Sequence, residues 1–333
     1  MFSKVRKALG LRKLYSNWLS TLIEYKVLGR PAIAVRCRGG ATNIISRELY
    51  LQLIDFLESE VLAGCVGGNL KLNIGGKTQL VPLEEVKQSQ GWLHLITRAL
   101  EHGWTYNIQG RYWERGGVKF IHMHQIIFVT FENEEYGVVD VRGRQVVDVG
   151  AFIGDSAIYF SLKGAERVYA IEPHPLAYEE LVQNVSLNGL QGKVVPLNLG
   201  ISYTENYIII PPNLGVEEAA GTLLTSMGSK GLRVKAKKLS EIVDEYKVKP
   251  DVLKIDCEGC EYDIILKDYD TVSQFEQVVF EYHAHNVGIP VSKLIELLSR
   301  QFSCSLINEH LYERIIPNWD KEEIGDYYCI KRR

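Results

Sequence analysis

Short apolar runs alternate with segments of helical spacing along the second half of the chain. The run Val146–Val149 is apolar apart from Asp148, as expected for a strand of a parallel sheet that is covered on both faces. Similar runs follow at 167–171, 194–197, 251–255, 278–283, 303–306 and 327–331, and helical spacing recurs at 156–162, 176–188, 239–246 and 291–301. The pattern predicts an α/β fold over residues 136–333, with a seven-stranded sheet, helices on both faces and a strand-rich insertion at 201–234.

The residues before Tyr136 have a different pattern. A strand is predicted at 32–35, and helices are predicted at 47–60 and 83–101. Strand patterns follow at 106–112 and 118–131, with a glycine turn between them. We therefore expect residues 31–135 to form a smaller α+β region, which could bind an acceptor or a partner.

Basic and apolar residues share the first thirty positions. These positions contain seven lysines and arginines but only one acid, Glu24. Leucines and Trp18 recur at helical spacing. The pattern predicts a basic amphipathic helix within residues 1–30. Two interpretations stay open: a helix that packs on its own protein, or a peripheral contact with an anionic membrane surface.

The overall composition narrows the class of protein. The 333 residues carry a formal net charge of −3, which gives no strong signal for nucleic-acid binding. No apolar run approaches the roughly 20 residues that span a bilayer. The six cysteines are scattered and no secretory signal precedes them, so we expect reduced thiols and a cytoplasmic protein.

Two histidine pairs and one cysteine pair have the spacing of metal motifs. His122 and His124 would share one face of a strand, as would His283 and His285. Neither pair has an acidic or cysteine ligand at a convincing spacing, and Cys257-Glu-Gly-Cys260 has no second cysteine pair to complete a zinc site. We therefore expect no metal and treat the cysteine pair as incidental.

The turn after Val149 is the first candidate binding site. Gly150 and Gly154 lack a Cβ, so the backbone there can approach a ligand closely. Ser156 is predicted to cap the following helix, whose free N–H groups would point toward the turn. Asp148 lies just before the turn, and ligands of open α/β sheets bind at the carboxyl ends of the strands.

Two polar residues at later strand ends limit which ligand the site can bind. Glu172 follows the second strand, where a carboxylate can accept hydrogen bonds from both ribose hydroxyls. Asn198 follows the third strand, where an amide could meet an adenine edge. The turn lacks the Gly-x-Gly core of a dinucleotide site, and the chain has no Walker lysine. We therefore predict S-adenosyl-L-methionine (SAM), which carries an adenosine but no phosphates.

Carboxylates crowd the next strand ends. The run Asp256-Cys-Glu-Gly-Cys-Glu261 places three of them after the strand at 251–255. Such crowding is costly unless the groups are solvated, paired or functional. The strand at 278–283 also ends in an acid and a histidine, Glu281 and His283.

These motifs resemble the FkbM family of SAM-dependent methyltransferases. The resemblance rests on residues 146–156, on 170–173 and especially on 251–262. It implies the Rossmann-like class I methyltransferase fold and O-methylation of a hydroxyl on a sugar, glycolipid or related metabolite. The positions that match the family's cofactor site are Asp148, Gly150, Gly154 and Glu172, and those that match its acidic motif are Asp256, Glu258, Gly259 and Glu261.

An alcohol acceptor must lose a proton during methyl transfer, which requires a general base. Asp256 and Glu258 are the candidate bases, with His283 as a competing base at the neighbouring strand end. The alternative role for Glu258 and Glu261 is stabilisation of a helix N-terminus, worth about 0.3–1 kcal/mol each. Two alternative functions stay open: a non-catalytic SAM- or nucleotide-binding scaffold in a glycan-assembly complex and, with less support, an RNA methyltransferase.

Overall fold

The computed structural model describes residues 10–88, 93–216 and 230–333. It divides the chain into two compact units, Met1–Gln125 and Ile126–Arg333, so the division falls before the boundary expected at Tyr136. Within the described ranges, no helix is both long enough and apolar enough to cross a membrane.

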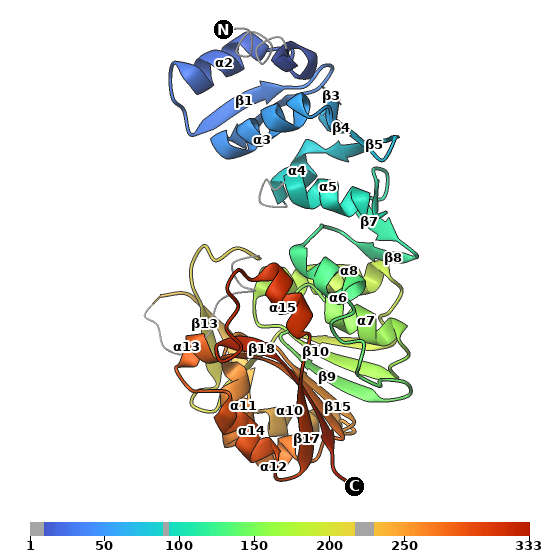
Figure 1. Ribbon diagram of the computed structural model, residues 1–333, viewed down its shortest axis with the longest axis vertical. Helices are drawn as coiled ribbons and strands as arrows, with labels where there is room; N and C mark the ends of the chain where they lie inside the picture. Colours follow the sequence, from blue (N-terminus) through green and yellow to red (C-terminus); the bar gives the residue numbers. More distant parts are fainter. Residues whose placement is uncertain (1–9, 89–92, 217–229) are drawn as a thin grey trace. The chain divides into compact units, whose positions relative to one another are not determined.

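The first unit is built from antiparallel strands and short helices (Figure 1). Ser46 ends the second strand and caps the helix that follows, because its Oγ accepts a hydrogen bond from the N–H of Leu49. The sheets are β1 (Ala32–Arg36) with β2 (Thr42–Ser46), then β3 (Leu62–Val66), β4 (Asn69–Ile74) and β5 (Lys77–Pro82), and finally β6 (Thr105–Asn107), β7 (Tyr112–Arg115) and β8 (Val118–Phe120). The helices are α2 (Trp18–Lys26), α3 (Arg47–Glu58), α4 (Leu83–Gln88) and α5 (Leu93–Glu101).

The expected N-terminal helix is interrupted in its described part. A helical turn at 10–14 is followed by Tyr15, which pairs with Cys37 and so separates the turn from α2. Residues 1–9 lie outside the described ranges, and so do residues 89–92 within the helix expected at 83–101.

The strand expected at 118–131 is wrong in its second part. β8 ends at Phe120, and α6 (Gln125–Glu132) follows. The apolar stretch of α6 includes Ile127, Phe128 and Val129, all buried. A short apolar run cannot be assigned to a buried strand or a buried helix by its period alone, which explains the error.

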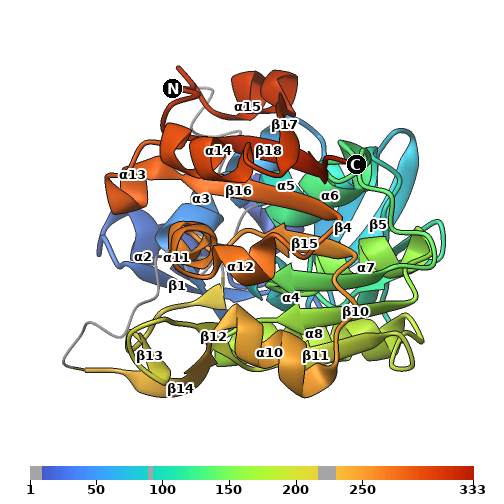
Figure 2. The same ribbon diagram turned by 90° about the horizontal axis from the view of Figure 1, so that it is seen from below.

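The second unit contains a seven-stranded sheet with the order β11-β10-β9-β15-β16-β18-β17 (Figures 1 and 2). Neighbouring strands are parallel except at β18, which runs antiparallel to β16 and β17. This is the class I methyltransferase fold, and all seven expected strands are confirmed. Their bounds are β9 (Gln145–Val149), β10 (Arg167–Ile171), β11 (Val194–Leu197), β15 (Val252–Ile255), β16 (Gln277–His283), β17 (Phe302–Ile307) and β18 (Ile324–Lys331).

Helices cover both faces of this sheet (Figure 1). Ile242, Ile264 and Leu294 of three helices join Val147 and Leu253 of the strands in one buried core. These helices are α10 (Leu239–Tyr246), α11 (Cys260–Lys267) and α14 (Ser292–Leu298), whereas α7 (Asp155–Leu162) and α8 (Pro175–Leu187) lie on the opposite face. The remaining elements are β12 (Gly200–Ile201), β13 (Tyr207–Ile210), β14 (Leu232–Lys237), α12 (Tyr269–Val272), α13 (Ala284–Val287) and α15 (Glu309–Ile315).

All six cysteines form disulfides, so the expectation of reduced thiols is wrong. The pairs are Cys37–Cys65, Cys257–Cys260 and Cys304–Cys329. Cys304 and Cys329 are direct neighbours in the register of β17 and β18, a proximity that their sequence separation hides. Disulfides persist in oxidising surroundings, so the paired cysteines give no support to the expected cytoplasmic location.

Candidate functional site

A pocket lies at the carboxyl ends of the central strands β9, β10, β15 and β16. In open α/β sheets, ligands bind at these ends, next to the point where the strand order reverses. Here that point lies between β9 and β15. The pocket is lined by Ile126, Val149, Gly150, Phe152, Ile171, Glu172, Pro173, Leu199, Gly200, Ile201, Ile208, Asp256, Cys257, Glu258, Cys260 and Glu281.

Two glycines shape the turn after β9. Gly150 has a φ of 76°, and a Cβ on it would lie 1.6 Å from the carbonyl oxygen of Asp256. The missing side chain therefore lets this turn pack against the end of β15. Gly154 has a φ of 87° and is itself the N-cap residue of α7, so the expectation that Ser156 caps this helix is wrong.

A buried ion pair supports this turn from within the protein. Asp148 has no exposed surface, and its Oδ1 lies 3.1 Å from Nζ of Lys254. Ser156 Oγ donates a hydrogen bond to Asp148 Oδ2 at 2.7 Å, and Lys254 Nζ donates one to the carbonyl of Gly150 at 2.7 Å. Burial opposes the charge of Lys254, but the surrounding carboxylates, Asp148 first, outweigh it and raise the pKa of the lysine.

These contacts change the roles expected from the sequence. Asp148, Gly154 and Ser156 hold the turn in place but do not line the pocket, whereas Gly150 does. Lys254 is not among the residues predicted for the site, although a lysine inside an otherwise apolar strand is itself a signal of a buried charged partner.

Glu172 lines the pocket at the end of β10. Its carboxylate accepts hydrogen bonds from the N–H groups of Phe152 at 2.9 Å and His174 at 2.7 Å, which fix its direction. Burial raises the pKa of Glu172 to about 7, although the two N–H groups lower it in part. The carboxylate keeps acceptor capacity for further donors.

The lining of this part of the pocket fits the adenosine portion of SAM. Glu172 offers a carboxylate suited to ribose hydroxyls, and Leu199 and Ile201 add apolar surface of the kind that a planar base needs. Asn198, which we expected near the adenine, instead donates from Nδ2 to the carbonyls of Glu172 and Pro173. It therefore stabilises the strand ends and does not line the pocket.

Three carboxylates line the other side of the pocket: Asp256, Glu258 and Glu281, named here the carboxylate cluster. Their side chains are 21%, 17% and 19% exposed. Burial, followed by the nearby Glu281, holds the pKa of Asp256 well above its usual range, and burial raises that of Glu258 to about 7. In the sequence, Glu281 is recognisable only as a strand-end acid, because its closeness to Asp256 depends on the pairing of β15 with β16.

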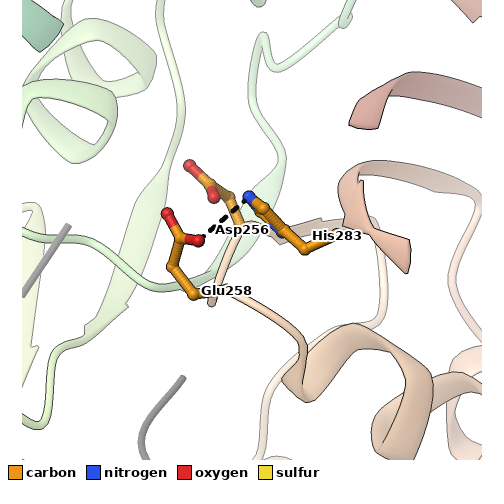
Figure 3. Close-up of side chains that lie close together, drawn as sticks. All are labelled: Asp256, Glu258 and His283. Carbon is orange, nitrogen blue, oxygen red and sulfur yellow. Dashed lines mark ion pairs between the residues drawn. The ribbon is translucent and has the colours of Figure 1, made fainter. Parts of the chain in front are cut away.

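His283 lies behind the carboxylate cluster and is 1% exposed. Its Nε2 is 3.3 Å from Glu258 Oε2 (Figure 3). The same nitrogen is 3.4 Å from Glu281 Oε2, and Nδ1 is 3.3 Å from Glu261 Oε1. Burial opposes protonation of His283, but these carboxylates, Glu281 first, outweigh it and raise its pKa to about 12. A histidine that is already protonated cannot accept a proton, so this geometry does not suit His283 as the base.

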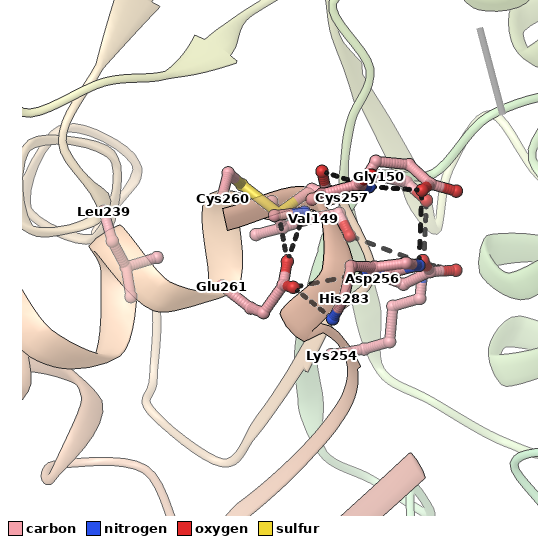
Figure 4. Close-up of a disulfide and its surroundings, with 12 residues drawn as sticks. Val149, Gly150, Leu239, Lys254, Asp256, Cys257, Cys260, Glu261 and His283 are labelled. Carbon is pink, nitrogen blue, oxygen red and sulfur yellow. Dashed lines mark hydrogen bonds and ion pairs between the residues drawn. A yellow bond between two sulfur atoms is a disulfide. The ribbon is translucent and has the colours of Figure 1, made fainter. Parts of the chain in front are cut away.

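The loop between β15 and α11 holds the cluster in place (Figure 4). Cys257 and Cys260 form a disulfide across it, and Gly259 donates its N–H to Glu261 Oε2 at 2.8 Å. The other oxygen of Glu261 accepts the backbone N–H of His283 at 2.8 Å. Through these two hydrogen bonds, the fully buried Glu261 joins the loop to the end of β16. Glu258 of the same motif instead lines the pocket.

The comparisons with known proteins agree with this site. The family model described as "Methyltransferase FkbM domain" matches residues 148–304, a range that runs from Asp148 through the carboxylate cluster. Residues 148–304 of this chain are thus similar to the FkbM methyltransferase domain. SAM is therefore the methyl donor, as the sequence predicted.

Proteins similar to this chain occur in several organisms. The hexuronic acid methyltransferase AglP of Haloferax volcanii is 27% identical over 233 residues, covering 65% of this chain and 88% of that protein. Methyltransferase sdnD of Sordaria araneosa is 28% identical over 151 residues, covering 36% of this chain and 58% of that protein. The crystal structure of methyltransferase FkbM from Methylobacillus flagellatus has a TM-score of 0.39 and 17% identity, covering 58% of this chain and 45% of that one.

Proposed function

We propose that this protein transfers the methyl group of SAM to a hydroxyl of a sugar-type acceptor. One observation carries the proposal: a single pocket brings Glu172, suited to the ribose of SAM, together with the carboxylate cluster, suited to a hydroxyl. The similarity to a hexuronic acid methyltransferase favours an acidic sugar as the acceptor.

Different residues of the pocket serve the cofactor and the acceptor in this reaction. SAM supplies the methyl group from its sulfonium sulfur. Gly150 and Glu172 hold the cofactor side of the pocket, while Asp256, Glu258 and Glu281 meet the acceptor. The acceptor hydroxyl loses its proton to the carboxylate cluster as its oxygen forms the new bond to carbon. His283 and Glu261 position the cluster from behind.

Neutral replacements in the carboxylate cluster are expected to slow turnover. We expect Asp256→Asn and Glu258→Gln each to lower kcat by about 100-fold, the lower scale of general-base loss, with SAM affinity little changed. Initial rates with labelled SAM give kcat, and isothermal titration gives the affinity. Asp263→Asn is the matched control, because this half-exposed residue of α11 pairs with Lys267 away from the pocket. Full activity in both variants would refute the assigned role.

A methyl-transfer screen distinguishes the acceptor classes. Labelled SAM is incubated with the protein and with cell extracts that are separated into glycan, lipid and RNA fractions. The proposal expects label in glycan or glycolipid, on oxygen. Label in RNA would favour the RNA methyltransferase, and SAM binding without transfer to any fraction would favour the scaffold. Titration with NAD tests for a dehydrogenase, which would bind NAD and not SAM.

The exposed face of α2 supports a second part of the proposal, contact with a membrane surface. Leu19, Ile23 and the C-cap residue Val27 are 57%, 50% and 75% exposed, and their spacing of four residues places them on one side of α2 and its C-terminal end. Lys26 and Arg30 are exposed nearby in sequence. Apolar residues beside basic ones suit insertion into an anionic lipid surface.

We expect Ile23→Glu/Val27→Glu to lower binding to phosphatidylglycerol-containing vesicles by about tenfold, because the stripe loses apolar area and gains charge. Co-sedimentation with vesicles measures this, and vesicles of phosphatidylcholine alone test the electrostatic part. Val138→Glu is the control, since Val138 is comparably exposed, at 53%, but lies in the second unit. Equal sedimentation of the wild type and the double variant would exclude α2 as the contact.

A further inference from the structure

Asp256, Glu258 and His283 have the geometry of a cation site. Each offers one ligand atom, and the three atoms lie within 4.8 Å of one another (Figure 3). Two ligand atoms bound at about 2.1 Å to one ion lie at most about 4.2 Å apart. Small side-chain rotations would therefore bring all three ligand atoms within reach of one ion. The residues come from two neighbouring strand ends that are paired in register, which fixes their backbones.

The charge around these residues is strongly negative. Four carboxylates meet here, those of Asp256, Glu258, Glu261 and Glu281. Lys254 contacts Asp256 but is shared with the buried Asp148, and His283 offsets the negative charge only while it is protonated. A divalent cation would offset the remaining negative charge within a partly buried site.

The orientation of the site also suits a cation that contacts substrate. Asp256 and Glu258 line the pocket, whereas His283 lies behind them, so an ion held by all three would keep coordination positions open toward the pocket. Two carboxylates with one imidazole favour a hard or borderline ion such as Mn²⁺ or Mg²⁺.

We propose that Asp256, Glu258 and His283 bind a divalent cation that holds the acceptor through its hydroxyl oxygen. The ion takes the place of the proton that His283 holds among these carboxylates, because only a neutral imidazole nitrogen can bind a metal. This inference rests on the proposed function, because the ion would act on the acceptor in that same pocket. It departs from the expectation of no metal, which rested on the spacing within the histidine and cysteine pairs, whereas Asp256 and Glu258 follow a different strand from His283. His122, from the other pair, has Nδ1 2.9 Å from Oε2 of Glu85.

The cation changes how the proton is lost. An oxygen bound to a divalent ion is more acidic, so the acceptor O–H bond breaks more readily. The oxygen then bonds to the methyl carbon, the carbon–sulfur bond breaks, and its electron pair stays on sulfur. The proton leaves to water, because the carboxylates that line the pocket are 17% to 21% exposed to solvent. An acceptor with two adjacent oxygen groups, such as a sugar acid, could chelate the ion.

Mn²⁺ binding tests this inference without any acceptor. Electron paramagnetic resonance measures free Mn²⁺ as the full-length, chelator-treated protein is titrated, and we expect one Mn²⁺ bound per chain. Asp256→Asn, Glu258→Gln and His283→Asn are each expected to weaken binding at least tenfold. The matched controls are Asp263→Asn and His310→Asn, which change exposed or half-exposed residues outside the cluster and are expected to leave it unchanged.

The outcomes separate this inference from the proposed function. Titration of each variant with SAM shows whether its pocket is still folded. A protein that binds SAM but no Mn²⁺, or whose three ligand variants bind Mn²⁺ like the wild type, overturns the cation site. Loss of methyl transfer on removal of the ion, with recovery on adding Mn²⁺, supports it. Mn²⁺ binding without transfer to any acceptor would keep the cation site and overturn the methyltransferase proposal.

Discussion

Lys254→Met is expected to lower the free energy of unfolding by about 3–5 kcal/mol, the usual cost of leaving one buried charge without its partner. Lys254 is 2% exposed and Asp148 is fully buried, and their charged atoms are 3.1 Å apart. The methionine fills a similar volume but leaves the carboxylate of Asp148 with a hydrogen bond only from Ser156 among the described contacts. Urea unfolding followed by circular dichroism measures the change.

The surface offers a matched control for this substitution. Lys267 and Asp263 also form an ion pair, at 2.7 Å, but both side chains are 47% exposed. Lys267→Met is therefore expected to cost less than about 1 kcal/mol. The double variant Asp148→Leu/Lys254→Met removes both charges and should recover much of the lost stability. Similar unfolding curves for Lys254→Met and Lys267→Met would show that the buried pair contributes little.

The same ion pair shows what the sequence could and could not reveal. The apolar run around Asp148 predicted its strand, and the glycines predicted the turn. Its partner Lys254 is more than one hundred residues away in the chain, on a strand that becomes its neighbour only in the folded sheet. The spacing of residues within one strand carries no information on this pairing, so Asp148 was assigned to the cofactor when the structure places it beneath the turn.

The sequence predicts a strand-end site residue when the strand and the residue belong to one continuous stretch of the chain. Glu172 and the Asp256–Glu261 run could be identified because a parallel strand that ends in an acid points to the ligand edge of the sheet. Glu281 and the Cys304–Cys329 disulfide could not, because each depends on which strands are neighbours. Strand order is set by crossovers and by packing of the helices, which the apolar period alone does not encode.

Gly150→Ala is expected to weaken SAM binding by at least about 100-fold and to lower the melting temperature. The new Cβ would lie 1.6 Å from the carbonyl oxygen of Asp256, so the turn or the end of β15 must move. Either movement displaces the wall that the cofactor and the carboxylate cluster share. The positive φ of 76° adds about 1 kcal/mol of backbone strain. Isothermal titration with SAM and thermal unfolding measure the two effects.

Gly189→Ala separates the strain of the backbone from the steric clash. Gly189 also has a positive φ, of 68°, but a Cβ there meets no atom within 4 Å. This variant should lose only the roughly 1 kcal/mol that a left-handed alanine costs and should bind SAM normally. The difference between the two variants then reports the contact of Gly150 with Asp256. Normal SAM binding by Gly150→Ala would mean that the turn can move without disturbing the cofactor site, and that Gly150 is not required there.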